Sequence, residues 1–284
     1  DNHLSIMGVK VLGDGALGSR GSALLKDYSD DPGNRGSYRF TDEEIYNVMS
    51  LAYNNGYQIA YHAIGDGAVR GTLDAYEEAR AAHGERDARH TITHVCAITD
   101  EDIQRMADLN VVGALQFLWM YGDALCDLER AYIGDERALS MYPVKKMRDA
   151  GIAITGASDA PVTPFVVLDE IEVGITRNSP YPEEEDTDMT RWPEQGLTAY
   201  QMLEAYTKNV AYQNFMDDII GTVEVGKFAD LVVLDTNMNV RKARTAFRDA
   251  GVALPKGCTI KWVEGEEKTY SMPVETFLEN ATVI

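Results

Sequence analysis

Short apolar runs alternate with amphipathic segments along most of the chain. Each run ends at Gly, Asp or Ser and is followed by loop residues. Strands that are buried on both faces of a parallel sheet are nearly continuous apolar runs, and helical crossovers connect them. The pattern therefore predicts an α/β fold. Its strands are expected at 9–12, 58–64, 91–95, 111–117 and 152–155.

Polar capping signals predict where the intervening helices begin. Thr41 and Glu44 form a capping box, and Thr198 with Gln201 forms a second one. Residues 99–102 place three acidic side chains at the positive end of another helix. The predicted helices lie at 42–54, at about 67–82, from 100 onward, and from 199 to about 215.

The alternation of apolar runs with amphipathic segments ends after Gly221. This change predicts a domain boundary near Ile220 and two domains, residues 1–220 and 221–284. Residues 228–234 and 259–269 are expected to be strands without a helical crossover between them. Residues 179–188 contain two prolines and five acidic residues and must form a loop. This loop is either a lid over a site or a solvated acidic loop.

Composition and charge narrow the function classes. Apolar residues make up 45% and charged residues 25%, and the formal net charge is −20. Phosphate backbones and anionic lipids repel such a chain, so we expect neither a nucleic-acid nor a membrane partner. No apolar run approaches the ~18 residues of a spanning helix. The spacing of the three cysteines fits neither a zinc site nor a disulfide framework, which favours a reducing cytoplasm.

Histidines lie within two successive predicted strands. His62 and His94 each interrupt an apolar run, where a polar side chain is costly to bury. Catalytic groups of βα barrels lie at the carboxyl ends of strands, so two neutral imidazoles there can bind one metal ion. Each histidine alone is better explained as a satisfied core or rim residue, and only their recurrence on successive strands favours a metal site. The other three histidines, His3, His83 and His90, have polar neighbours and are expected at the surface.

Two further charged residues lie at strand positions. Asp159 follows the last predicted strand, where a carboxylate can bind a divalent metal or take a proton from water. A turn aspartate before Pro161 is the structural alternative. Lys10 lies between two valines, and a lysine that faces a barrel interior has a lowered pKa.

Two segments are candidates for substrate contacts. Residues 14–20 form a glycine-punctuated loop that ends at Arg20 and lacks a phosphate-binding fingerprint. Residues 117–121 include Trp119 and either line an apolar substrate pocket or pack in the core. Arg20 and Trp119 are the predicted substrate-binding residues.

The order of these residues resembles the second half of an amidohydrolase-superfamily barrel. The motifs are similar to amidohydrolase family 3, which includes N-substituted formamide deformylases and exoenzyme-regulator-like proteins. The matching segments are Lys10 with 14–20, 30–36, 62–66, 158–162 and 221–235. The resemblance implies strands four to eight of a TIM-like barrel in 1–220, about five βα units. It also implies the C-terminal part of a composite β-sandwich in 221–284.

The resemblance also implies a site and a reaction. His62, His94, Lys10 and Asp159 would be the metal ligands, with zinc most expected, as one or two ions, and with Lys10 open to carboxylation. Asp159 would also deliver a proton to the leaving nitrogen. The reaction would be hydrolysis of a non-peptide C–N bond in a small amide-like substrate.

The chain departs from the family pattern in several places. Thr93 stands where a glutamate is frequent, Ala160 stands where an aromatic residue is frequent, and no His-x-His pair occurs. The chain also begins with Asp1, so we expect a C-terminal piece of a longer enzyme, inactive by itself. Five strands cannot close a barrel. The expected partners are the N-terminal half of the parent chain and further copies of this chain.

Two other functions stay open at this point. The chain could be a non-catalytic amidohydrolase-like protein that uses the scaffold for binding or regulation. It could also be a metal-free lyase in which Lys10 forms a Schiff base, although the order of His62, His94 and Asp159 along the predicted strands argues against this function.

Overall fold

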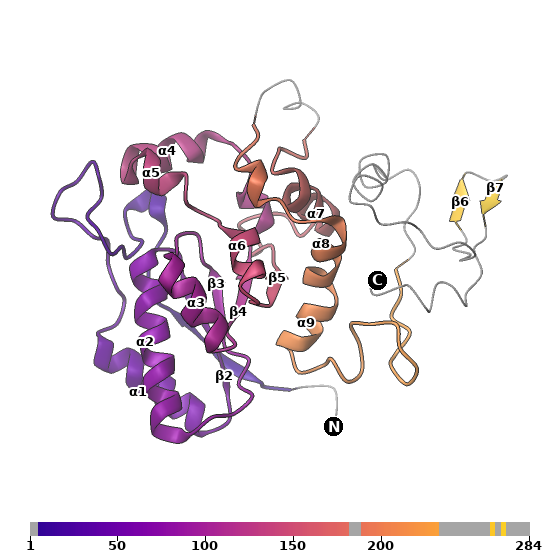
Figure 1. Ribbon diagram of the computed structural model, residues 1–284, viewed down its shortest axis with the longest axis horizontal. Helices are drawn as coiled ribbons and strands as arrows, with labels where there is room; N and C mark the ends of the chain where they lie inside the picture. The colour runs from indigo at the N-terminus through magenta and orange to yellow at the C-terminus, as the bar shows by residue number, and fades with distance from the viewer. Residues whose placement is uncertain (1–4, 182–188, 233–261, 265–267, 271–284) are drawn as a thin grey trace.

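The computed structural model describes residues 5–181, 189–232, 262–264 and 268–270. Parallel strands alternate with helices, as the alternation of apolar runs and amphipathic segments predicts (Figure 1). The strands of the main sheet are β1 (Gly8–Leu12), β2 (Gln58–Ala63), β3 (Thr91–His94), β4 (Val112–Leu115) and β5 (Ile154–Gly156). The helices are α1 (Asp42–Asn54), α2 (Asp66–His83), α3 (Asp100–Asp108), α4 (Ala124–Ile133), α5 (Asp135–Ala138), α6 (Val144–Asp149), α7 (Val167–Thr176), α8 (Ala199–Tyr206) and α9 (Lys208–Gln213). Three short 3-10 helices are η1 (Leu17–Ser19), η2 (Phe117–Trp119) and η4 (Pro193–Gln195).

The sheet has the strand order β1-β2-β3-β4-β5, and each neighbouring pair is parallel. The α/β class and all five predicted strands are therefore confirmed, with ends that differ by one to two residues. β1 and β5 are the edges of this sheet. None of the described helices is long and apolar enough to cross a membrane.

Both capping boxes are present, but the last predicted long helix is not continuous. Thr41 and Thr198 each accept a hydrogen bond from the backbone three residues later. The helix that starts at Ala199 ends at Tyr206, and α9 follows after Thr207, whose φ is −131° and ψ −84°. Thr207 donates its Oγ1 hydrogen to the Leu203 carbonyl at 2.8 Å. Such side-chain bonds to the preceding turn compete with regular helix geometry.

The C-terminal strand predictions are wrong in part. Residues 228–232 form no strand, because no neighbouring strand among the described residues offers hydrogen bonds to them; residues 233 and 234 lie outside the described part. The single strand expected at 259–269 is instead an antiparallel pair, β6 (Trp262–Glu264) and β7 (Lys268–Tyr270). The acidic loop is described only at 179–181 and 189 onward. The predicted division at Ile220 stays a prediction.

The two faces of the sheet differ in burial. Val11, Ile59 and Tyr61 lie on the helix-covered face and are at most 8% exposed. The opposite face is more open, since Lys10 is exposed and His62 is partly exposed. The expectation of strands buried on both faces is therefore wrong for β1 and β2, because the described strands form an open sheet rather than a closed barrel. The candidate site lies on this open face.

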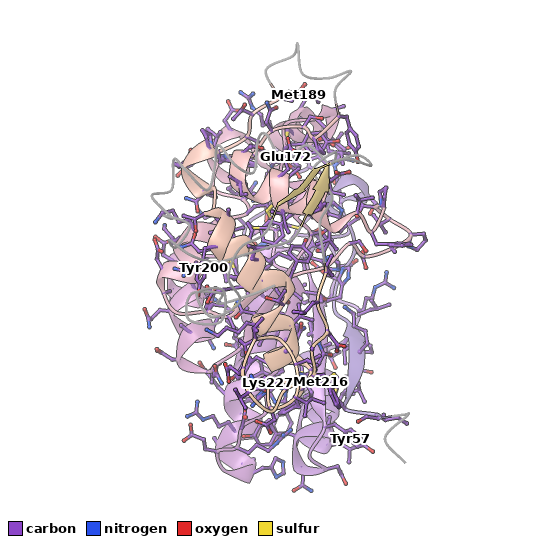
Figure 2. All side chains as sticks on the ribbon, turned by 90° about the vertical axis from the view of Figure 1, so that its right-hand side faces the viewer. Tyr57, Glu172, Met189, Tyr200, Met216 and Lys227 are labelled. Atoms are coloured by element: carbon purple, nitrogen blue, oxygen red, sulfur yellow. The ribbon has the colours of Figure 1, made fainter. Side chains whose placement is uncertain are left out.

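The starts and the ends of the strands lie toward opposite ends of the molecule. Figure 2 shows Tyr57, which precedes β2, at one end together with Met216 and Lys227. Glu172 on α7 and Met189 lie toward the other end, where the strands finish. The side-chain amide of Gln58 donates to the Gln213 carbonyl at 2.7 Å and thereby connects the last residue of α9 to the starting end of the sheet.

His90 is not a surface residue, contrary to the sequence prediction. It is 6% exposed, and its ring stacks on Tyr76 with a centroid distance of 4.6 Å. The Ile59 backbone N–H donates to His90 Nδ1 at 3.1 Å. Burial lowers the pKa of His90 to about 3. The polar neighbours in the sequence misled the prediction because the chain enters β3 directly after this residue.

This buried imidazole predicts a pH dependence of stability. The unfolded chain protonates His90 below pH 6.5, whereas the folded state keeps it neutral down to about pH 3. The contribution of neutral His90 to the free energy of unfolding is therefore fully present above pH 6.5. It is lost as the pH falls toward 3, and the total loss is a few kcal/mol at most. We expect His90→Asn, which retains an acceptor for Ile59, to flatten this part of the curve in urea unfolding between pH 7 and 4. The exposed His83→Asn is the control, and equal slopes for wild type and His90→Asn would contradict the prediction.

Candidate metal centre

His62 lies on β2, and His94 is the last residue of β3. Their ring centroids are 4.3 Å apart, with the planes at 69°. In the register of the sheet His62 pairs with Thr93, so regular strand geometry would place His94 on the opposite face. His94 instead has a φ of 80°, a left-handed conformation that ends the strand and allows its ring to meet His62. Such backbone strain in residues other than glycine is concentrated at functional sites.

Both imidazoles are neutral at pH 7. Burial lowers the pKa of His62 to about 4, and the neighbouring His94 and Lys10 act in the same direction. Burial also lowers the pKa of His94 to about 4, against the opposing effect of its hydrogen bond to Gln116. Neutral imidazole is the form that binds metal ions.

One nitrogen of each ring faces a buried acceptor. His94 Nδ1 lies 2.7 Å from Gln116 Oε1, which is 3% exposed as a residue. His62 Nε2 is buried, makes no hydrogen bond among the described residues, and lies 3.3 Å from Asp14 Oδ1. Acceptors behind a metal-binding histidine orient the ring and select the nitrogen that binds. The other nitrogens, His94 Nε2 and His62 Nδ1, are then the ones that can bind an ion.

Asp14 connects the site to three backbone N–H groups in two segments of the chain. It is 1% exposed, and burial raises its pKa to about 6. Its Oδ1 accepts from the Ile64 N–H at 3.0 Å, and its Oδ2 accepts from the N–H groups of Gly65 at 2.9 Å and Ala23 at 3.1 Å. Gly65 is required here, since a Cβ would lie 2.0 Å from the Ala23 carbonyl oxygen.

Lys10 lies beside the histidines on the same face. Its Nζ donates to Thr93 Oγ1 at 2.6 Å, and Thr93 Oγ1 in turn donates to the Tyr61 carbonyl at 3.1 Å. Lys10 is exposed as a residue, but partial desolvation of its amine lowers the pKa of Lys10, while the carboxylate of Asp159 acts to raise it. Thr93, which departs from the family pattern, is thus the direct partner of the Lys10 amine.

Asp159 lies three residues after β5, with a left-handed φ of 55° and an exposed side chain. Its negative charge acts to raise the pKa of both Lys10 and His62. It does not join the two histidines in a set that could hold an ion. The described residues contain no group of three or more His, Cys, Asp or Glu side chains arranged for metal binding.

The donor chemistry at this position fits a divalent metal in part. Two neutral imidazoles whose rings are in contact suit zinc or a similar ion, and each has a buried acceptor near one of its nitrogens. Structural and catalytic zinc sites have at least three protein ligands. The histidine pair of the described residues is therefore an incomplete ligand set.

The two predicted substrate-binding residues have different surroundings. Trp119 stacks on His94, with ring centroids 5.2 Å apart and planes at 4°, so it forms a wall of the site. Arg20 pairs with the Asp30 carboxylate, and its guanidinium lies 3.9 Å over the Tyr132 ring. These contacts give Arg20 a structural role in the loop after β1, and its predicted contact with substrate stays a prediction.

Asp14 and Gln116 were missed as parts of the site. Asp14 lies in the glycine-punctuated loop, and Gln116 follows β4 directly. Both are polar residues directly at or shortly after a strand end, which is the signal that identified His94 and Asp159. Their roles depend on side-chain distances across neighbouring strands, which spacing in the sequence does not provide.

Comparisons with known proteins identify the family of this chain. The chain is 32% identical over 235 residues to Protein LONG AFTER FAR-RED 3 of Arabidopsis thaliana, covering 82% of this chain and 39% of that protein. It is 28% identical over 205 residues to the N-substituted formamide deformylase of Arthrobacter pascens, covering 70% of this chain and 35% of that protein. An uncharacterized metal-dependent hydrolase from Pyrococcus horikoshii OT3 superposes with a TM-score of 0.69 at 27% identity, covering 82% of this chain and 45% of that one.

The chain thus spans less than half the length of these proteins. The model of the Amidohydrolase family matches residues 1–267, nearly the whole sequence. The resemblance that the motifs indicated is confirmed: the chain belongs to the amidohydrolase family.

Proposed function

We propose that this chain carries the His, His and Asp portion of a metal-dependent hydrolase site that cleaves non-peptide C–N bonds in small amide-like molecules. The observation that carries the proposal is the pair of neutral imidazoles at adjacent strand ends, each backed by a buried acceptor. The formamide deformylase among the relatives supports the choice of bond. Zinc is the ion we propose, as one or two ions.

The residues of this chain have distinct roles in the proposed reaction. A bound divalent metal would supply Lewis-acid activation of a carbonyl group and of water. His62 and His94 would hold it, with Asp14 and Gln116 fixing the orientation of their rings. Asp159 would take the proton from water and deliver it to the leaving nitrogen. Trp119 would exclude water from one side of the site through its stack on His94.

We propose that the remaining ligands come from a preceding half of a longer parent chain, so that this piece is inactive by itself. The incomplete ligand set and the less-than-half coverage of the relatives support this proposal. β1 and β5 are the edges at which that half, or another copy of this chain, would add strands. Lys10 would complete the site as an amine or, once carboxylated, as a bridging ligand.

Metal titration of this chain tests the proposed ligands. We expect Zn²⁺ to bind with an affinity at least ~10-fold higher in the wild type than in His62→Ala or His94→Ala, because each variant removes one of two imidazoles. The matched control is His83→Ala, an exposed histidine on α2. Competition with a chromogenic chelator measures the affinities. Equal affinities for all four proteins would refute the ligand assignment.

Activity separates the proposal from its main alternative, a non-catalytic amidohydrolase-like binding protein. Assays of the parent chain against a panel of non-peptide amides, with and without chelator, distinguish the two. Chelator-sensitive release of an amine supports the hydrolase. Metal binding through His62 and His94 without turnover of any C–N substrate supports the non-catalytic alternative.

A further inference from the structure

A second cluster of charged side chains is built from residues outside the histidine site. We name it the buried arginine cluster, and it consists of Arg177, Arg191, Trp192 and Glu129. Arg177 is 0% exposed and Arg191 is 6% exposed. The guanidinium carbons of Arg191 and Arg177 lie 3.5 Å and 5.9 Å from the centroid of the Trp192 ring. Two cations therefore lie together beside one indole.

The charges in this cluster do not balance. Arg191 Nη2 donates to Glu129 Oε2 and forms a buried ion pair. Arg177 has only neutral hydrogen-bond partners among the described residues: its Nε donates to the Arg191 carbonyl at 3.1 Å, and its Nη1 donates to Met120 Sδ at 3.0 Å. Glu194, which also acts on Arg177, is exposed and screened by water.

Arg177 nevertheless stays charged at neutral pH. Burial and the neighbouring Arg191 lower its pKa only to about 10. A buried charge without a counter-ion is strongly destabilising. The described surroundings of Arg177 therefore lack one negative charge.

The unpartnered polar atoms of the cluster are all hydrogen-bond donors. Arg177 Nη2, Arg191 Nε and Trp192 Nε1 are buried and have no hydrogen-bond partner among the described residues. A guanidinium or indole N–H can donate but cannot accept. The other buried unpartnered side-chain atoms in the described part of the chain belong to residues outside the cluster: His62, Arg86, His90 and Thr155.

This arrangement discriminates between water and an anion. A water molecule could accept from these donors but would need acceptors for its own two hydrogens. The acceptors that the described cluster residues are seen to use, Glu129 Oε2 and the Arg191 carbonyl, already accept hydrogen bonds from Arg191 and Arg177. An anion accepts from several donors and has no hydrogen to place, and a single negative charge matches the surplus.

We propose that the buried arginine cluster is a binding site for a small monovalent inorganic anion of the halide class, held by Arg177, Arg191 and Trp192. The complete burial of Arg177 disfavours a larger organic carboxylate. The site is adjacent to the proposed metal centre, since Arg177 contacts Met120 directly after η2, and Trp119 of η2 stacks on His94. The anion would fasten α7 to this wall.

Thermal unfolding of the complete chain tests the proposal with chloride as the probe. In NaCl, compared with sodium gluconate at equal ionic strength, we expect a saturable rise in melting temperature. At 100-fold excess over Kd the ratio of folded to unfolded protein rises about 100-fold. Arg177→Met should abolish the difference between the two salts. Arg130→Met makes the same charge change at an exposed ion pair on α4. This control variant should retain the difference in melting temperature between the two salts.

A direct measurement keeps the proposal testable if Arg177→Met does not fold. Crystals of the wild-type chain grown in bromide should show an anomalous peak within hydrogen-bond distance of Arg177 Nη2. No such peak, or equal chloride stabilisation in wild type and a folded Arg177→Met, would overturn the proposal. Neither result depends on metal binding or hydrolysis.

Discussion

Asp14→Ala is expected to lower the free energy of unfolding by about 3–6 kcal/mol, among the largest effects of any single substitution in this chain. The variant leaves three buried N–H groups, those of Ala23, Ile64 and Gly65, without their acceptor. Each such group costs ~1–3 kcal/mol, and partial relaxation reduces the sum. Urea unfolding followed by circular dichroism measures the loss.

A carboxylate in the same part of the chain provides the control. Asp30→Ala removes an acidic side chain that pairs with Arg20 at a partly exposed position. Pairs of this kind contribute up to about 1 kcal/mol. A loss for Asp14→Ala as small as that for Asp30→Ala would show that the three backbone groups find other partners, and that the loop after β1 does not depend on Asp14.

In the parent chain, Asp159→Asn is expected to reduce kcat at least ~100-fold on any C–N substrate that the enzyme hydrolyses, since an amide cannot carry the proton in the proposed reaction. The substitution preserves shape, and Asp159 is exposed, so the fold should not change. Steady-state kinetics with release of the amine product measures the effect.

Asp149→Asn is the matched control, because Asp149 is a carboxylate at the end of α6, before β5 rather than after it, and pairs with Lys145. It should leave kcat unchanged. An Asp159→Asn enzyme with wild-type kcat would remove Asp159 from the proposed reaction, while a loss of metal together with kcat would assign it to binding rather than to proton transfer.

The candidate site was predictable in its residue types but not in its geometry. His62 and His94 stand out because imidazoles interrupt apolar strands, and the structure brings their rings together. The strand register alone would place the two rings on opposite faces of the sheet. The left-handed backbone of His94 brings its ring to the face of His62 instead. The two acceptors behind the rings, Asp14 and Gln116, come from other segments and could be identified only from interatomic distances.

The sequence by itself determined the five strands of the main sheet, their order and the starts of the capped helices, because alternating apolar runs and capping boxes are local properties of neighbouring residues. Thr41 and Thr198 open their helices as predicted. The tertiary structure decided whatever depends on partners distant in the sequence: the burial of His90, the break at Thr207, the missing strand at 228–232 and the unbalanced charge of Arg177. Burial and hydrogen-bond pairing are properties of neighbours in space, and a run of residues does not specify those neighbours.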